Sequence, residues 1–437
     1  MSKSKRLKLD WMLLAASAAL IAGCSESSSP PFRLNMTNVV AKQISPEHQQ
    51  AIANILGGMF GTPDKPVALP ETGLDQRKLD MAAGPVWSEQ AGGKHGLYRR
   101  HCVHCHGISG DGQGPTASVL NPYPRDYRPG VYKFKSTFTS AEPTTADLTK
   151  TLHDGIPGTA MPSFALLPPD EVAALVEYVK YLSIRGQMET ALVNHAADEL
   201  EPNDKFDPAA DPAVQKLVMQ DLLGPIIESW KGAPTQMIMP EDGAIPPADR
   251  SPQDVAASVK AGRELFYGAK ANCVKCHGPT ALGDGQQDDF DNWNKANNEF
   301  IRATNDMVGQ IETLRADLAK AQGEDADNLR QQIRDAQKEY SERHALMATL
   351  LSPRNAIPRN LREGVFRGGR RPIDIFWRVS AGIPGTPMPA SGPASEGAPG
   401  TLTQQEIWQL VDYVQSLQFE PASQPQKRPI NSEVVSK

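Results

Sequence analysis

Two five-residue strings place a pair of cysteines directly before a histidine: CVHCH at residues 102–106 and CVKCH at residues 273–277. Thiols and imidazoles at this density could bind zinc, form a redox dithiol or attach a haem. A zinc site needs four ligands in one place, whereas these two pairs lie far apart in the chain. A thioredoxin-like dithiol is expected within a βαβ unit, which the sequence does not show. The strings have the pattern of covalent c-type haem attachment.

The spacing within each string has a physical reason. Residues three apart lie on the same face of a helical turn, so both thiols can reach the two vinyl groups at one haem edge. The histidine that follows can then bind the iron from below. The sequence therefore predicts two covalently bound haem c groups. The predicted attachment residues are Cys102, Cys105, Cys273 and Cys276, and the predicted proximal iron ligands are His106 and His277.

The chain also contains an internal repeat that follows both motifs in the same order. GDG recurs at residues 110–112 and 283–285, NPYPRDYRPGVYKF (121–134) corresponds to NAIPRNLREGVFRG (355–368), DLTKTLHDGIPGTAMPS (147–163) to DIFWRVSAGIPGTPMPA (374–390), and EVAALVEYVKYLS (171–183) to EIWQLVDYVQSLQ (406–418). The last block of each half has apolar residues at helical spacing. Each half therefore predicts the same helical unit.

This arrangement resembles class I cytochrome c domains, in the variety that also forms the c-type haem subunits of haem–copper oxidases. The resemblance implies an all-α fold with two such domains in tandem, over residues 91–186 and 258–420. It also implies that a methionine in a Gly-Pro-rich loop is the sixth iron ligand, at Met161 and Met388. His153 precedes the first of these methionines, but its counterpart Ser380 cannot bind iron, so we expect His153 to have no such role.

The resemblance suggests further contacts around each haem. The family usually has a proline whose carbonyl orients the proximal imidazole; Pro115 fits this pattern, and the second half has no equivalent. Gly96 and Gly262 occupy the family's positions for helix–helix contact. Candidates for bonds to the haem propionates are Tyr123, Arg125, Arg128, Arg359 and Arg362.

The N-terminus has the features of an export signal, with a basic segment, a short apolar core and then Gly23-Cys24. It resembles a bacterial lipoprotein signal, in which Cys24 becomes the lipidated first residue; an ordinary cleaved signal with a chance cysteine is the alternative. We therefore expect the protein to be anchored by lipid in the cell envelope, facing the periplasm.

The remaining segments connect or decorate the two haem units. Within residues 288–349, apolar side chains recur at 4-3-4-3 spacing, which predicts a helical hairpin or coiled-coil-like projection. The predicted organisation is a signal peptide (1–23), a tether (24–35), an N-terminal extension (36–90) with a helix from Pro46 to Phe60, the first cytochrome c domain (91–186), a linker (187–257) with a helix near residues 213–230, the second domain (258–420) with its insertion at about 288–349, and a polar tail (421–437).

Composition limits the functions that fit. The 437 residues carry a net charge of -6, which does not suggest a nucleic-acid-binding surface. Beyond the N-terminus, no apolar run has transmembrane length. We expect a membrane-tethered periplasmic di-haem cytochrome that transfers electrons through His/Met-ligated haems, with redox proteins as partners and a membrane respiratory complex among the candidates. We expect it to be a carrier and no enzyme; the alternative is a di-haem oxidoreductase of the peroxidase or sulfur-compound oxidase type.

Overall fold

The computed structural model describes residues 30–86, 96–393, 395 and 397–423. The predicted signal peptide and Cys24 lie outside these ranges. Within these ranges all regular secondary structure is helical. Backbone pairing of the β type occurs there only at isolated bridges, such as that between Thr137 and Met237. The predicted all-α fold class is confirmed. None of the helices in these ranges is both long enough and apolar enough to cross a membrane.

The first repeat (residues 91–186) is built on a short helical haem motif and one long helix. Its helices are α5 (Leu97–His101), α6 (Val103–His106), α7 (Thr145–Asp154) and α8 (Pro169–Glu199). The helix predicted at residues 171–183 is present in α8, but it continues to Glu199. It can continue because the N-terminal extension and the linker cover it, through α3 (Pro46–Phe60), α4 (Gln76–Ala82) and α10 (Leu223–Gly232).

The N-terminal extension and the linker follow the predictions in part. Helix α3 has the predicted bounds, because Ser45 caps its first turn and Pro46 occupies the first helical position. The single helix predicted near residues 213–230 is instead interrupted: α9 (Pro212–Lys216) passes through a π-helical turn, η4 (Leu217–Leu222), into α10. A short helix, α2 (Met36–Ala41), begins the extension.

The second repeat (residues 258–420) contains the equivalent helices α11 (Pro252–Tyr267), α12 (Val274–His277), α15 (Pro372–Ala381) and α16 (Gln404–Ser416). Helices α11 and α16 pack closely at Gly262, as expected for a helix-contact position. Gly96 differs from this expectation: it is the N-cap of α5, in a left-handed conformation with φ +73°. The structure also has 3-10 turns at Pro70–Thr72, Ala117–Val119, Ala233–Gln236, Leu361–Glu363, Leu417–Phe419 and Pro421–Ser423.

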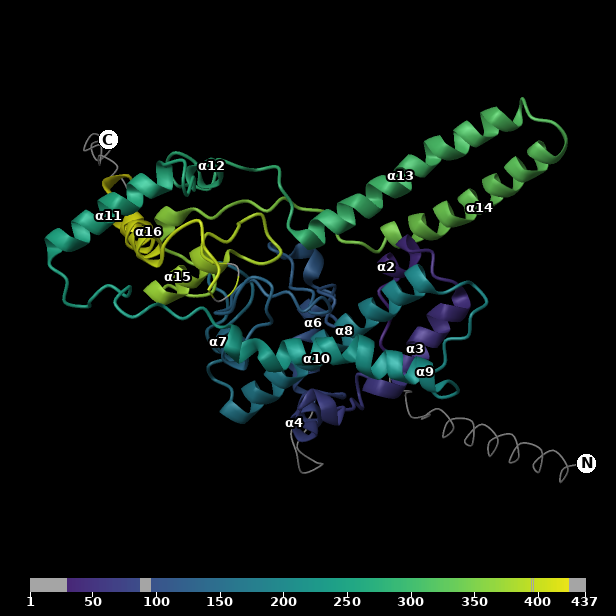
Figure 1. Ribbon diagram of the computed structural model, residues 1–437, viewed down its shortest axis with the longest axis horizontal. Helices are drawn as coiled ribbons and strands as arrows, with labels where there is room; N and C mark the ends of the chain where they lie inside the picture. Colours follow the sequence, from purple (N-terminus) through teal and green to yellow (C-terminus); the bar gives the residue numbers. More distant parts are fainter. Residues whose placement is uncertain (1–29, 87–95, 394, 396, 424–437) are drawn as a thin grey trace, which may run out of the picture.

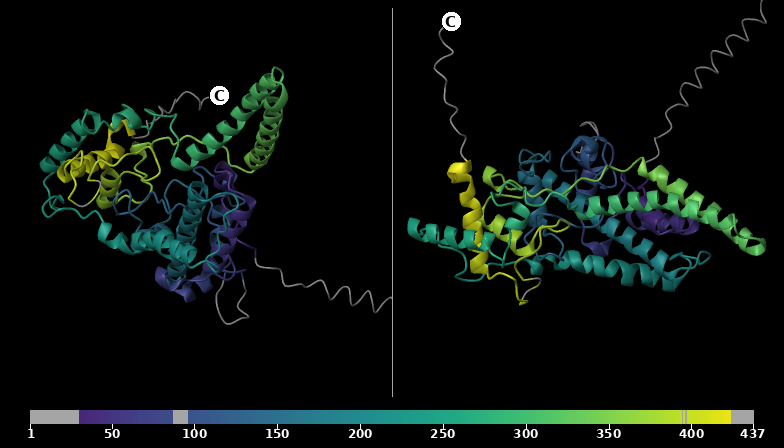
Figure 2. Two further views of the ribbon diagram at one scale, coloured as in Figure 1. Left: turned by 45° about the vertical axis from the view of Figure 1, so that its right-hand side comes forward. Right: turned by 90° about the horizontal axis from the view of Figure 1, so that it is seen from above.

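The insertion forms the predicted helical hairpin. Helices α13 (Asn292–Leu318) and α14 (Gly323–Met347) lie side by side and project from the body of the molecule (Figures 1 and 2). Met307, Ile311 and Ile333 are buried along the contact between the two helices, as their spacing predicts. The base of α14 packs beside α2, where Gln43 Nε2 donates to Glu339 Oε2 at 3.0 Å. The hairpin is therefore attached at both the second repeat and the N-terminal extension.

Candidate haem sites

One cavity of about 250 Å³ brings together the four residues of the first predicted haem site. Cys102, Cys105 and His106 reach it from the haem motif, and Met161 reaches it from the loop after α7. The rest of the lining is largely apolar and aromatic, as a haem pocket requires. The sequence spacing alone could not bring Met161 to this motif; the packing of α5 and α7 against α8 does so.

The proximal histidine of the first site is held in a defined orientation. His106 Nδ1 donates to the backbone carbonyl of Arg125 at 3.0 Å, and its ring stacks on Tyr127 with centroids 4.6 Å apart. Burial lowers the pKa of His106 to about 4, so the imidazole is neutral at pH 7. With Nδ1 protonated, Nε2 keeps the free lone pair that iron requires.

The expected role of Pro115 is wrong. Pro115 is exposed, and the carbonyl that orients His106 belongs to Arg125. Because Arg125 has an equivalent at Arg359 in the repeat, the lack of a second proline does not distinguish the two halves.

The loop that carries Met161 is closed by short-range hydrogen bonds. Ile156 N donates to Met161 O at 3.1 Å, and Met161 N donates to Thr159 Oγ1 at 3.1 Å. Gly158 permits the turn, with φ +71°. The side chain of Met161 is half-buried at the cavity. These bonds restrict where the thioether can lie.

The second site repeats this local architecture. Ile383 N donates to Met388 O at 3.1 Å, and Met388 N donates to Thr386 Oγ1 at 3.3 Å. Burial lowers the pKa of His277, and the backbone of Arg359 partly offsets that fall. His277 Nδ1 nevertheless makes no hydrogen bond of standard geometry, so it is a buried polar atom without a partner among the described residues. The orientation of His277 is thus less constrained than that of His106.

The surroundings of the cysteines bear on the three initial hypotheses. A reactive dithiol needs a lowered thiol pKa, but burial raises the pKa of Cys102 to about 12 and that of Cys273 to about 11. Neither pair forms a disulfide. Within the described ranges, no three His, Cys, Asp or Glu side chains gather as a zinc site would require. A pair of free cysteines directly before a neutral imidazole, as at residues 102–106, fits covalent haem.

The remaining candidate residues have different environments. Arg128 is paired with Asp126 at 2.8 Å, and Arg362 with Glu420 at 2.8 Å, so both contribute to the fold. His153 Nδ1 lies 2.8 Å from Asp154, and its side chain does not line the cavity.

Tyr123 and Arg125 do line the first cavity, as expected for propionate contacts. Lys133 and Arg367 line it as well. Neither residue was predicted from the sequence to contact the haem. No local signal could identify Arg367, because it belongs to the second repeat.

Comparisons with known proteins agree with this geometry for the first repeat. The family model described as cytochrome c matches residues 92–183. These residues form a cytochrome c domain, of a family that carries covalently bound haem c. No curated protein matches the chain.

A solved structure, the Kuenenia stuttgartiensis reducing HAO-like protein complex, is similar with a TM-score of 0.41 and 22% identity. The similarity covers 74% of this chain and 93% of that one. It is too distant to support an argument about substrates or partners. The expectation that the chain is no enzyme is contradicted by this similarity to a reducing HAO-like complex, and we withdraw it.

Proposed function

We propose that this protein is a di-haem c-type cytochrome that transfers electrons, with each iron ligated by one histidine and one methionine. The observation that carries the proposal is the convergence of Cys102, Cys105, His106 and Met161 on one cavity. The matching hydrogen bonds of the Met161 and Met388 loops support a second site of the same type in residues 258–420.

The residues around the first cavity suit this function. A bound haem would supply a one-electron centre, and His/Met ligation raises its reduction potential. His106 presents a neutral imidazole that its hydrogen bond and its aromatic neighbour hold in place. Leu148, Leu152 and Phe164 line the cavity beside Met161 and give it apolar walls. A fixed imidazole and apolar walls would limit the rearrangement that accompanies each electron transfer.

We further propose that lipid at Cys24 tethers the protein to a membrane on its periplasmic side. The basic segment, the short apolar core and the cysteine that follows them support this proposal. Two acyl signals or more are needed for stable anchoring, which lipoprotein modification supplies. Redox proteins, including a membrane respiratory complex, are the proposed partners.

The ligands are tested by spectroscopy of the purified holoprotein. We expect two covalent haems by mass spectrometry and a methionine-to-iron charge-transfer signal from both in near-infrared magnetic circular dichroism. Met161→Ala and Met388→Ala should each remove one of these signals and lower the potential of one haem. Met239→Ala is the matched control, since this methionine is 66% exposed and should leave both signals intact.

Two results would contradict the proposal. One is a single covalent haem per chain. The other is ready formation of a carbon monoxide adduct at either iron of the wild-type protein, because a vacant coordination position would indicate chemistry on a bound small molecule.

A further inference from the structure

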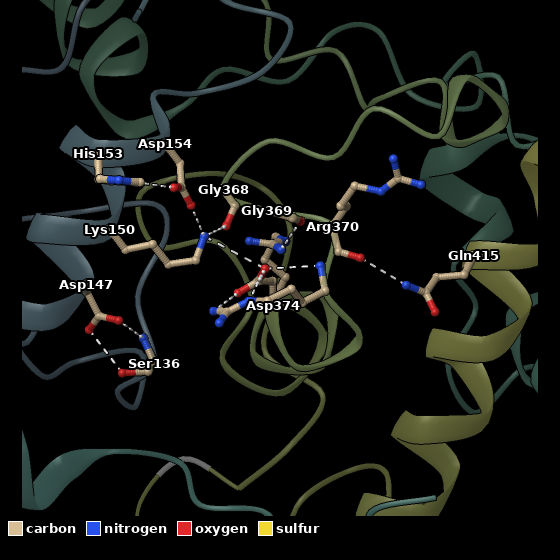
Figure 3. Close-up of polar contacts among 12 residues, drawn as sticks. Ser136, Asp147, Lys150, His153, Asp154, Gly368, Gly369, Arg370, Asp374 and Gln415 are labelled. Carbon is tan, nitrogen blue, oxygen red and sulfur yellow. Dashed lines mark hydrogen bonds and ion pairs between the residues drawn. The ribbon is translucent and has the colours of Figure 1, made fainter. Parts of the chain in front are cut away.

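The first haem cavity is completed by the other repeat. Arg367, from the segment between Glu363 and α15, lines this cavity together with Arg125 and Lys133 of the first repeat. Its position is fixed by its neighbours in sequence. Lys150 Nζ of α7 donates to the carbonyl of Gly368 at 3.3 Å and lies 3.8 Å from Asp374 Oδ2 (Figure 3).

Further contacts hold the segment that carries Arg367. A Cβ placed on Gly368 would lie 2.5 Å from the ring of Phe134, so the two repeats are in close contact there. Arg378 Nη2 donates to the carbonyl of Gly369 at 2.8 Å from within the second repeat. Arg367 therefore reaches the first cavity from a segment that is fixed on both sides.

The two methionine loops make reciprocal contacts with the opposite repeat. A Cβ on Gly158, in the Met161 loop, would lie 3.0 Å from Nη2 of Arg359. A Cβ on Gly385, in the Met388 loop, would lie 3.9 Å from Nη1 of Arg125. Arg125 and Arg359 are equivalent positions of the repeat. Each methionine loop thus faces the equivalent arginine of the other repeat.

These four side chains, Arg125, Lys133, Arg359 and Arg367, form an inter-repeat cation cluster with few anions. Asp291 is bonded to Lys133 at 2.9 Å, and Glu363 lies 3.4 Å from Arg359. Arg359 Nε and Arg367 Nε are buried without a hydrogen-bond partner among the described residues.

The pKa directions agree with this shortage of anions. Burial lowers the pKa of Arg125 and of Arg367, and the charge of Arg359 lowers that of Arg367 further. Buried cations and unpaired donors are costly unless an anion joins them. Among the described residues no carboxylate forms an ion pair with Arg125 or Arg367, so further carboxylates would stabilise the cluster.

We propose that the inter-repeat cation cluster binds haem propionates, and that Arg367 of the second repeat binds a propionate of the haem attached in the first. The inference rests on the proposed function, because only a bound haem brings these carboxylates. A guanidinium can bind a carboxylate through two parallel hydrogen bonds. Each haem would then be held by both repeats, and haem binding would stabilise their mutual orientation.

Arg367→Gln tests this inference through the midpoint potential of each haem. Removing a positive charge beside a haem favours its oxidised form, so we expect the midpoint potential of the first haem to decrease. A tenfold change in the one-electron equilibrium corresponds to about 59 mV, and we expect a shift of about this size for a charge in partial contact with solvent. The loss of the methionine signal in Met161→Ala identifies which potential belongs to the first haem.

Two variants control for charge and fold. Arg370→Gln removes the same charge from an exposed position three residues away, and it should leave both potentials within a few millivolts of wild type. Arg367→Lys retains the charge and should keep the potential of the first haem close to its wild-type value. Haem content and circular dichroism of each variant establish that it is folded and loaded.

The outcomes separate this inference from the proposed function. If both haems are present with His/Met ligation but Arg367→Gln matches Arg370→Gln, the inference alone is wrong. It is also wrong if the potential of the second haem changes and that of the first does not. If the first repeat of the wild-type protein carries no haem, the proposed function itself fails.

Discussion

Replacing Gly262 by alanine tests whether the crossing of α11 and α16 stabilises the second repeat. A Cβ at this position would lie 2.6 Å from the carbonyl carbon of Gln409 and 2.9 Å from Cβ of Tyr413. Carbon atoms in favourable contact are about 3.5–4 Å apart, so the two helices would have to separate by about 1 Å. The atoms in the way belong to helix backbone and to a buried tyrosine, and neither can rotate aside.

The cost follows from this overlap. Overpacking a well-packed contact destabilises by about 1–3 kcal/mol, and a clash with backbone places Gly262→Ala at the upper end, about 3 kcal/mol. Since each 1.4 kcal/mol is a factor of ten, local opening of α11 and α16 should become about 100-fold more frequent. Hydrogen exchange measured by mass spectrometry on the holoprotein reports how often each helix opens, through the exchange rates of its peptides.

Gly309→Ala is the matched control for that experiment. Gly309 is also within a helix, α13, but a Cβ there meets no atom within 4 Å. Alanine should therefore stabilise α13 locally, by up to about 1 kcal/mol, and leave exchange in α11 and α16 unchanged. Exchange of Gly262→Ala within threefold of wild type in both helices would refute the packing argument.

Two other predictions concern residues away from the haem sites. Burial raises the pKa of Glu142 from its ordinary value of 4.5 to about 7, so the folded protein keeps a proton that the unfolded chain releases. The free energy of unfolding should then fall between about pH 4.5 and 7, by about 3 kcal/mol. Denaturant titrations across this range should show the fall in wild type and lose it in Glu142→Gln, and an unchanged slope in the variant would contradict the assignment. Cys24→Ser should move the protein from the membrane fraction to the soluble periplasmic fraction after cell fractionation, and a variant that stays with the membrane would exclude lipid at Cys24 as the anchor.

Local patterns in the sequence determined the chemistry and several elements of this protein. The spacing of Cys102, Cys105 and His106 specifies haem attachment because neighbouring positions on one helical turn reach one porphyrin edge. The helix Pro46–Phe60 was predicted with its bounds because the cap and the first-turn proline act locally. The hairpin at 292–347 was predictable because its apolar spacing matches the contact between its own two helices.

The tertiary structure alone decided how these parts are supported. Helix α8 extends to Glu199 because segments from both sides of the first repeat pack on it. The carbonyl of Arg125, and not that of Pro115, orients His106, because a carbonyl is present at every residue and only folding selects one. Arg367 reaches the first cavity because Lys150 and Phe134 hold its segment against the first repeat. Contacts between residues so distant in the chain depend on the packing of whole elements, which no local spacing encodes.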